Sequence, residues 1–107
     1  MKNEYGVTLD RNGYSPSLLQ RDARCYICGF YGRTARHEAY GGPLRQKSKR
    51  LGLWMHLCPT CHQNGPQAAH RSAETATWLK RKAQEAAMSR YRWDVETFIA
   101  QFGRNYL

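Results

Sequence analysis

The most regular pattern of hydrophobic and polar positions lies in the last third of the chain. Small and apolar residues recur there at the spacing of one helix face, and lysine, arginine and glutamine fill many of the positions between them. The residues of this apolar face are Ala76, Leu79, Ala83, Ala86 and Ala87. Ser72 is suited to cap the first turn, because its hydroxyl can accept a hydrogen bond from an unpaired backbone N–H. The pattern therefore predicts a helix that begins after Ser72.

A second, shorter helix is predicted to follow Asp94. Asp94 is a favourable N-cap residue, and Trp93 and Phe98 have the N′ and N4 spacing of a hydrophobic staple. Gly103 stands where this helix would end. Segment 71–107 is therefore predicted to contain two helices.

The first 24 residues have the pattern of a short β-hairpin and a connecting segment. Val7-Thr8-Leu9 precedes Asp10-Arg11-Asn12-Gly13, and an Asn-Gly pair favours a tight hairpin turn because both residues tolerate positive φ. Segment 25–70 contains all four cysteines and all four histidines. We therefore expect a single α+β domain in three parts, which are residues 1–24, 25–70 and 71–107.

Length and composition exclude several classes of protein. The chain has 107 residues, enough for one small domain, and its 41% hydrophobic and 23% charged residues are not those of a disordered chain. No apolar run approaches the roughly 18–20 residues of a membrane span, and the first residues lack the apolar core of a signal peptide. We expect a cytoplasmic protein, not a transporter, a receptor or a secreted disulfide scaffold. In so small a chain, Trp54 and Trp78 are expected to be buried.

The charge of the chain is strongly basic and unevenly distributed. Seventeen lysines and arginines against eight acidic residues give a formal net charge of +9. Segment 33–50 carries six basic residues and one acid, and segment 71–92 carries six basic residues and two acids. Two such stretches predict a polyanionic partner, in the first place nucleic acid. The alternative is a basic, solvated surface without a partner.

The four cysteines form two Cys-x-x-Cys pairs, Cys25/Cys28 and Cys58/Cys61. Each pair can present two thiolates to one ion, and two pairs complete the tetrahedral coordination of a structural zinc ion. The competing interpretations are two disulfides or one redox-active pair. Disulfides are disfavoured in a chain without an export signal, and a thioredoxin-like pair would need a βαβ context that the pattern does not show. The spacing therefore predicts a structural Zn²⁺ site.

Two histidines and a Gly-Gly pair accompany the cysteines. Segment 33–42 has a histidine followed by Gly-Gly, segment 51–58 is an apolar strand that leads into Leu-Cys, and His62 follows the last cysteine. This arrangement resembles the HNH (His-Me finger) nuclease family in its zinc-stapled form. Less specifically, segments 9–14 and 102–107 resemble those of small HNH-like proteins encoded by bacteriophages.

The resemblance implies a treble-clef or ββα-metal core over residues 25–70 and a DNA-cleaving activity. By that likeness, His37 is the general base that activates water for attack on a phosphodiester. His62 is a ligand of a catalytic Mg²⁺ or similar divalent ion, which stabilises the leaving oxygen. His70 could reach the same ion if the chain folds back there. Glu38, the one carboxylate within residues 23–73, is the second candidate catalytic residue, since it is the one acid that the motif could use locally. A phage-encoded protein of this kind would act in the cytoplasm of the bacterial host.

Two positions depart from the family pattern. The family usually has a metal-binding aspartate before the first histidine, where this chain has Arg36, and an asparagine where it has Leu53. Leucine can neither bind a metal nor orient a histidine. Either Glu38, Asn64 or His70 replaces the missing groups, or the scaffold has lost catalysis.

The favoured function is a nuclease that binds nucleic acid, in the first place double-stranded DNA, and nicks or cuts it. Basic residues beside the first histidine and in the loop after it would hold phosphates, with salt-dependent binding and little sequence readout. These residues are Arg36, Arg45, Lys47, Lys49 and Arg50. The alternative is a catalytically inactive zinc module, a phage accessory or inhibitor protein, that binds nucleic acid or protein. A third reading is a zinc-stapled interaction domain whose charge serves an acidic protein partner.

Overall fold

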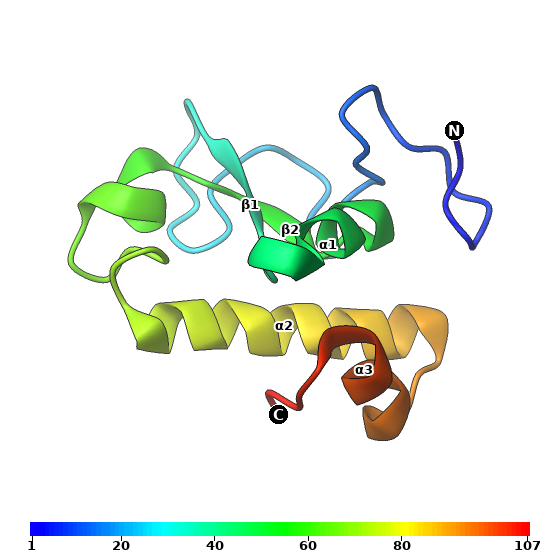
Figure 1. The fold of residues 1–107 in the computed structure, drawn as a ribbon. Helices are drawn as coiled ribbons and strands as arrows, with labels where there is room; N and C mark the ends of the chain where they lie inside the picture. Colours follow the sequence, from blue (N-terminus) through cyan, green and yellow to red (C-terminus); the bar gives the residue numbers. More distant parts are fainter.

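The computed structural model describes residues 1–107 and has two short strands and three α-helices (Figure 1). In chain order the elements are β1 (Ala35–Glu38), the 3-10 turn η1 (Gly42–Leu44), α1 (Arg45–Leu51), β2 (Trp54–Leu57), the π-helical turn η2 (Thr60–Asn64), α2 (Ala73–Tyr91) and α3 (Val95–Phe102). The predicted α+β class is confirmed. None of the helices combines the length and the hydropathy needed to cross a membrane.

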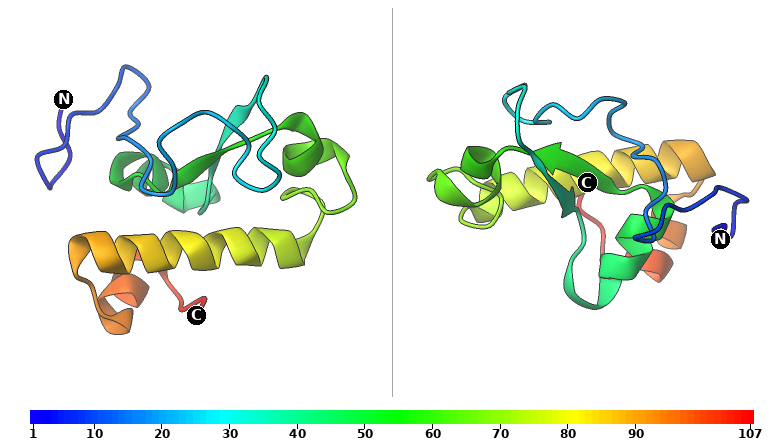
Figure 2. Two further views of the ribbon diagram at one scale, coloured as in Figure 1. Left: turned by 180° about the vertical axis from the view of Figure 1, so that it is seen from behind. Right: turned by 90° about the horizontal axis from the view of Figure 1, so that it is seen from above.

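The two strands form an antiparallel sheet whose faces have different surroundings. His37 lies opposite Met55 and Glu38 lies opposite Trp54, so alternation along the strands places these two pairs on opposite faces. Met55 is fully buried in the same apolar cluster as Leu79 of α2. Figures 1 and 2 accordingly show α2 as a layer below the sheet and α1. The face of the sheet that carries His37 and Met55 is therefore the one that packs toward α2. We call it the first face, and the face that carries Glu38 and Trp54 the second face.

Helix α2 begins where the sequence predicts. The hydroxyl of Ser72 accepts a hydrogen bond from the backbone N–H of Thr75 at 3.2 Å. Leu79, Ala83 and Ala87 are fully buried, which is the spacing of one helix face. Small alanines on this face let the helix lie close to the sheet and to α1.

Helix α3 also has the predicted caps. The carboxylate of Asp94 accepts a hydrogen bond from the backbone N–H of Thr97 at 2.7 Å, and Gly103 ends the helix in the left-handed region with φ +92°. The rings of Trp93 and Phe98, the predicted staple, lie 6.5 Å apart between centres. The C-terminal helices are thus defined by local signals at both ends.

Tyr40, just after β1, links the sheet to both C-terminal helices. Its side chain is fully buried, and its ring centre lies 5.8 Å from that of Phe98 and 4.6 Å from that of Phe102. Its hydroxyl donates a hydrogen bond to the carbonyl of Lys80 in α2 at 2.6 Å. This anchor fixes the end of β1, and with it the position of His37.

The N-terminal segment does not form the predicted hairpin. It contains one isolated bridge, between Lys2 and Thr8, and the turn at Asp10–Gly13 is closed by the Asp10 carboxylate, which accepts a hydrogen bond from the N–H of Tyr14 at 3.0 Å. The chain after the turn does not return to pair with residues 7–9. It covers the second face of the sheet, where the indole N–H of Trp54 donates to the carbonyl of Ser15 at 2.8 Å. Packing against the sheet has replaced local hairpin pairing.

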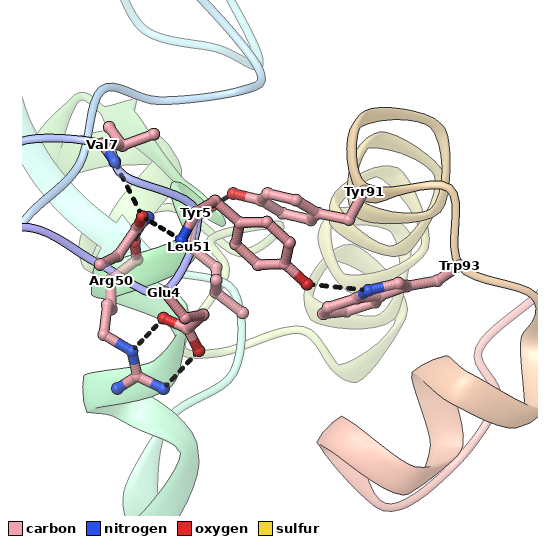
Figure 3. Close-up of polar contacts among 8 residues, drawn as sticks. Glu4, Tyr5, Val7, Arg50, Leu51, Tyr91 and Trp93 are labelled. Atoms are coloured by element: carbon pink, nitrogen blue, oxygen red, sulfur yellow. Dashed lines mark hydrogen bonds and ion pairs between the residues drawn. The ribbon is translucent and has the colours of Figure 1, made fainter.

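The first residues attach this segment to α1 and to the end of α2 (Figure 3). Glu4 forms an ion pair with Arg50 of α1 at 2.9 Å. The ring of Tyr5 stacks on that of Tyr91 with centres 4.3 Å apart, and its hydroxyl accepts a hydrogen bond from the indole N–H of Trp93 at 3.1 Å. The N-terminal segment therefore bridges α1 and the junction between α2 and α3.

Two other predictions differ from the structure. The basic segment 45–50, predicted as a loop, belongs to α1, whose Ser48 and Leu51 are buried and which ends at Gly52 with φ +79°. A Cβ at Gly52 would lie 2.5 Å from the carbonyl oxygen of Pro16, so the helix end is also a site of close backbone approach. Trp54 is buried as expected, but Trp78 is 39% exposed because the buried face of α2 is centred on the residue after it.

Candidate metal centres and nucleic-acid interface

The four cysteines converge as the spacing predicts. The sulfur atoms of Cys25, Cys28, Cys58 and Cys61 all lie within 4.8 Å of one another, and no disulfide joins them. The sulfurs of Cys28 and Cys58 are 3.8 Å apart. Two thiolates bound tetrahedrally to one zinc ion, each at about 2.3 Å, lie about 3.8 Å apart. The group therefore fits a tetrathiolate zinc ion.

Local backbone geometry presents the thiols toward one point. In the first pair, Gly29 adopts φ +78° and its N–H donates to the carbonyl of Cys25 at 2.9 Å, which closes a tight turn. The second pair follows β2 directly, and Cys61 lies in the turn η2. Tyr26 is tied to β2, because its N–H donates to the carbonyl of His56 at 2.8 Å. Each pair is thus held beside the sheet by backbone hydrogen bonds.

The thiols differ in acidity. Burial raises the pKa of Cys25, but hydrogen bonds from the backbone of Cys28, Cys58 and Ile27 outweigh burial and lower that pKa to about 6. Burial and the neighbouring thiols raise the pKa of Cys61. A full set of thiolates therefore needs a cation among them, and occupancy of the site depends on pH.

Three of the four histidines form a second cluster. The ring nitrogens of His37, His62 and His70 lie within 4.8 Å of one another. The Nε2 atoms of His62 and His70 are 2.9 Å apart, and the centre of the His37 ring lies 5.3 Å and 5.2 Å from the centres of the other two. His37 belongs to β1, His62 to η2, and His70 to the loop before α2. The structure thus brings together the three histidines that the sequence singled out.

The second cysteine pair also positions two of these histidines. The N–H of His62 donates to the carbonyl of Cys58 at 2.8 Å, and the N–H of Ala69 donates to the carbonyl of Cys61 at 2.8 Å. The N–H of His70 in turn donates to the carbonyl of His62 at 3.1 Å. The chain folds back between His62 and His70, and both imidazoles depend on the turn that the cysteines hold.

The surroundings of His37 and His62 favour neutral imidazoles. Burial lowers the pKa of His37 to about 4, and the neighbouring His62 and His70 act in the same direction. Burial and the charge of His70 likewise lower the pKa of His62. Neutral imidazole is the form that binds a metal ion or accepts a proton.

The donor set distinguishes between metals. Two imidazole nitrogens bound tetrahedrally to one ion at about 2.0–2.1 Å each lie about 3.3–3.4 Å apart. The Nε2 atoms of His62 and His70 are closer, at 2.9 Å, which corresponds to an angle of about 90° at the ion. Imidazole suits zinc and other late transition metals, whereas Mg²⁺ prefers oxygen ligands. No carboxylate belongs to the cluster. The residues present therefore fit a transition-metal ion and do not fit the predicted Mg²⁺.

Glu38, proposed from the sequence as a local acid, is engaged elsewhere. Its carboxylate accepts a hydrogen bond from the hydroxyl of Tyr14 at 2.6 Å and forms an ion pair with Arg45 at 2.7 Å. Adjacent residues of a strand face opposite ways, so Glu38 and His37 lie on different faces. Tyr14 was missed as a partner because it is 24 residues away in a segment for which the sequence predicted a local hairpin.

The positions that depart from the HNH pattern supply no metal ligand. Leu53 is fully buried in the core, and Arg36 forms an ion pair with Asp10 at 2.9 Å. Asn64 is exposed, and its carbonyl accepts a hydrogen bond from Arg71 at 2.9 Å. Of the three replacements considered from the sequence, His70 alone belongs to the cluster.

The five basic residues predicted to hold phosphate are largely engaged within the chain. Three of them form ion pairs and two make other contacts. Four of the five residues belong to α1, and Arg36 lies on the face of β1 opposite His37. The contacts are Arg36–Asp10 at 2.9 Å, Arg45–Glu38 at 2.7 Å, Arg50–Glu4 at 2.9 Å, Lys47 to the Gln101 carbonyl at 2.7 Å, and the Lys49 ammonium 4.7 Å from the centre of the Tyr14 ring. Exposed ion pairs of this kind are weak, so a phosphate could compete for these cations. Binding of nucleic acid here stays a prediction.

The interpretation of both metal centres depends on the sequence and structure of this chain alone. Comparisons with protein-family models, with curated proteins and with solved structures found no match. The structure establishes a tetra-cysteine group that could hold a metal ion such as zinc, beside a cluster of three histidines.

Proposed function

We propose that this chain is a metal-dependent nuclease of the HNH-like, ββα-metal type that nicks or cleaves double-stranded DNA at the three-histidine cluster. The observation that carries the proposal is the convergence of His37, His62 and His70 from three separate elements beside a tetra-cysteine group. The formal charge of +9 supports a polyanionic substrate. In this proposal the cysteines bind structural zinc and the histidines provide the reactive centre.

His62 and His70 are the proposed ligands of the catalytic metal. Their Nε2 atoms form the closest pair of donors in the cluster, 2.9 Å apart, and both residues are held by the backbone of the turn η2. A divalent transition-metal ion bound there would stabilise negative charge on the phosphate and on the leaving oxygen. The chain supplies the rigid attachment that keeps both imidazoles directed at one point.

His37 is the proposed general base. It lies on a strand whose end is anchored by the buried Tyr40, and its own side chain is buried. Its ring centre is about equally distant from those of His62 and His70, at 5.3 Å and 5.2 Å, which places it beside the proposed metal and within reach of a water molecule there. Its role is to accept the proton of the attacking water.

The test is a supercoiled-plasmid nicking assay with zinc-loaded protein in Zn²⁺, Co²⁺, Mn²⁺, Mg²⁺ or chelator. Wild type is compared with His37→Ala and with His56→Ala, a matched control because His56 is the one histidine outside the cluster. We expect nicking that requires a transition-metal ion, falls at least about a hundredfold in His37→Ala, and persists in His56→Ala. Equal nicking by the two variants would refute the role of His37.

One observation favours a second function. Leu53 is buried where the HNH pattern has a polar residue, and Arg36 is paired with Asp10 where the pattern has a metal ligand. A zinc module that binds nucleic acid without cutting it would retain the tetra-cysteine group and the positive charge. Folded, zinc-loaded protein that shifts DNA in a gel but nicks no plasmid in any of these metals would establish this alternative.

A further inference from the structure

A cavity of about 360 Å³ that opens to solvent lies directly beside the histidine cluster. It is bordered by the start of β1, the end of β2 and the turn η2, and His62 belongs both to its wall and to the cluster. Its lining residues are Arg33, Thr34, Ala35, Leu57, Pro59, His62, Gln63 and Asn64. Cavities of about 300 Å³ or more are large enough for a small ligand.

The charge of this cavity comes from one cation without a partner. Arg33 is exposed and forms no ion pair or side-chain hydrogen bond, unlike Arg36 and Arg45, which are both paired with carboxylates. No carboxylate lines the cavity. A guanidinium left unpaired in a site without acids favours an anionic ligand, and its planar fork matches the oxygens of a phosphate.

The opposite wall adds neutral hydrogen-bond donors. The side-chain amides of Gln63 and Asn64 make no hydrogen bond within the protein, so both are free to donate to a ligand. The backbone at Asn64 is nevertheless fixed, because its carbonyl accepts a hydrogen bond from Arg71 at 2.9 Å. Gln63 and Asn64 of η2 and Arg33 of the segment before β1 thus line the same cavity as His62.

We propose that this cavity is a phosphate-binding subsite in which Arg33 and the amides of Gln63 and Asn64 hold the phosphate group of the substrate nucleotide that adjoins His62. The inference rests on the proposed nuclease function and assigns a substrate contact separate from the basic residues of α1. Free phosphate and a phosphodiester in DNA both present anionic phosphate oxygens to such a site. The experiments distinguish these two ligands.

The first experiment needs no catalysis. Zinc-loaded, ¹⁵N-labelled protein is titrated with inorganic phosphate, and the backbone and side-chain signals of Gln63, Asn64 and Arg33 are followed by NMR. We expect saturable shifts in the cavity, affinity lower by about tenfold or more in Arg33→Ala because a charged hydrogen bond is lost, and little change in Arg11→Ala. Arg11 is a matched control because it is also an exposed arginine without an ion pair.

The outcomes separate clearly. Absence of saturable shifts, shifts outside the cavity, or equal affinity in Arg33→Ala and wild type would each overturn the subsite. Phosphate binding that depends on Arg33 in a protein that never nicks DNA would uphold the anion site and reject the nuclease function.

The second experiment tests the phosphodiester. In steady-state nicking of a short DNA duplex, Arg33→Ala should lose at least about tenfold in kcat/KM, and Arg33→Lys should recover only part of it, since lysine keeps the charge and loses the fork. Arg11→Ala should nick at the wild-type rate. Equal kcat/KM in Arg33→Ala and wild type would mean that DNA does not use this cavity.

Discussion

Substitution of Cys58 by serine is expected to remove a large part of the stability of the fold. Cys58 is buried, and its sulfur lies 3.8 Å from that of Cys28, which is 30 residues away in the chain. A metal bridge between the two pairs therefore closes a loop of about 30 residues, which corresponds to about 4 kcal/mol of lost chain entropy in the unfolded state. A domain of this size has a total free energy of unfolding of about 5–15 kcal/mol. The variant should thus lose between about a quarter and four-fifths of the stability of the fold.

Urea denaturation followed by circular dichroism, together with metal analysis, measures this loss. Zinc-loaded wild type should bind one zinc at the cysteines and unfold cooperatively. Cys58→Ser, and wild type stripped with a chelator, should lose the zinc and at least about 4 kcal/mol of unfolding free energy. Thr60→Ala is the matched control, because Thr60 lies inside the same Cys-x-x-Cys turn and supplies no thiolate. Cys58→Ser that kept its zinc and unfolded within about 1 kcal/mol of wild type would refute a four-thiolate site.

Three further predictions concern single side chains. Ser72→Ala should lower the free energy of unfolding by about 1 kcal/mol, because Ser72 caps α2; an unchanged urea midpoint would contradict this. Tyr40→Phe should lower the free energy of unfolding by about 1–3 kcal/mol, because the Lys80 carbonyl loses a buried donor. Urea denaturation of the variant and of wild type measures this difference. Without a second metal, His37 should stay neutral down to about pH 4, so its contribution to stability is complete above about pH 6.5 and is lost as the pH falls toward 4. An NMR titration of His37 with a midpoint near 6.5 would show that burial does not lower its pKa.

Local signals in the sequence predicted the C-terminal helices and the cysteine group. The caps of α2 and α3 are set by residues next to the helices, Ser72 and Asp94, so no knowledge of distant contacts was needed. Cys-x-x-Cys spacing likewise carries its geometry within four residues. The convergence of His62 and His70 depended on a single fold-back of eight residues, which the sequence offered as one alternative.

Features that depend on distant contacts could not be predicted in this way. The basic residues of α1 suggested a loop, because the helix has only seven residues and its buried side is formed by Ser48 and Leu51. The Asn-Gly turn suggested a hairpin, but residues after it pack on the sheet instead. The sequence assigned Glu38 to the site, but in the structure its partners are Tyr14 and Arg45. Both partners lie in segments whose placement the sequence does not reveal.

The most direct test of the proposed centre is a titration of nicking activity with metal. Metal-free protein is first given one equivalent of zinc for the cysteines and then increasing Co²⁺, and the initial rate of plasmid nicking is recorded for wild type and His62→Ala. The two-centre account predicts no activity with the first equivalent, saturation near one equivalent of Co²⁺, and no recovery in His62→Ala despite a folded, zinc-loaded protein. Full activity with zinc at the cysteines alone, or equal activity in His62→Ala, would contradict a catalytic metal at His62 and His70.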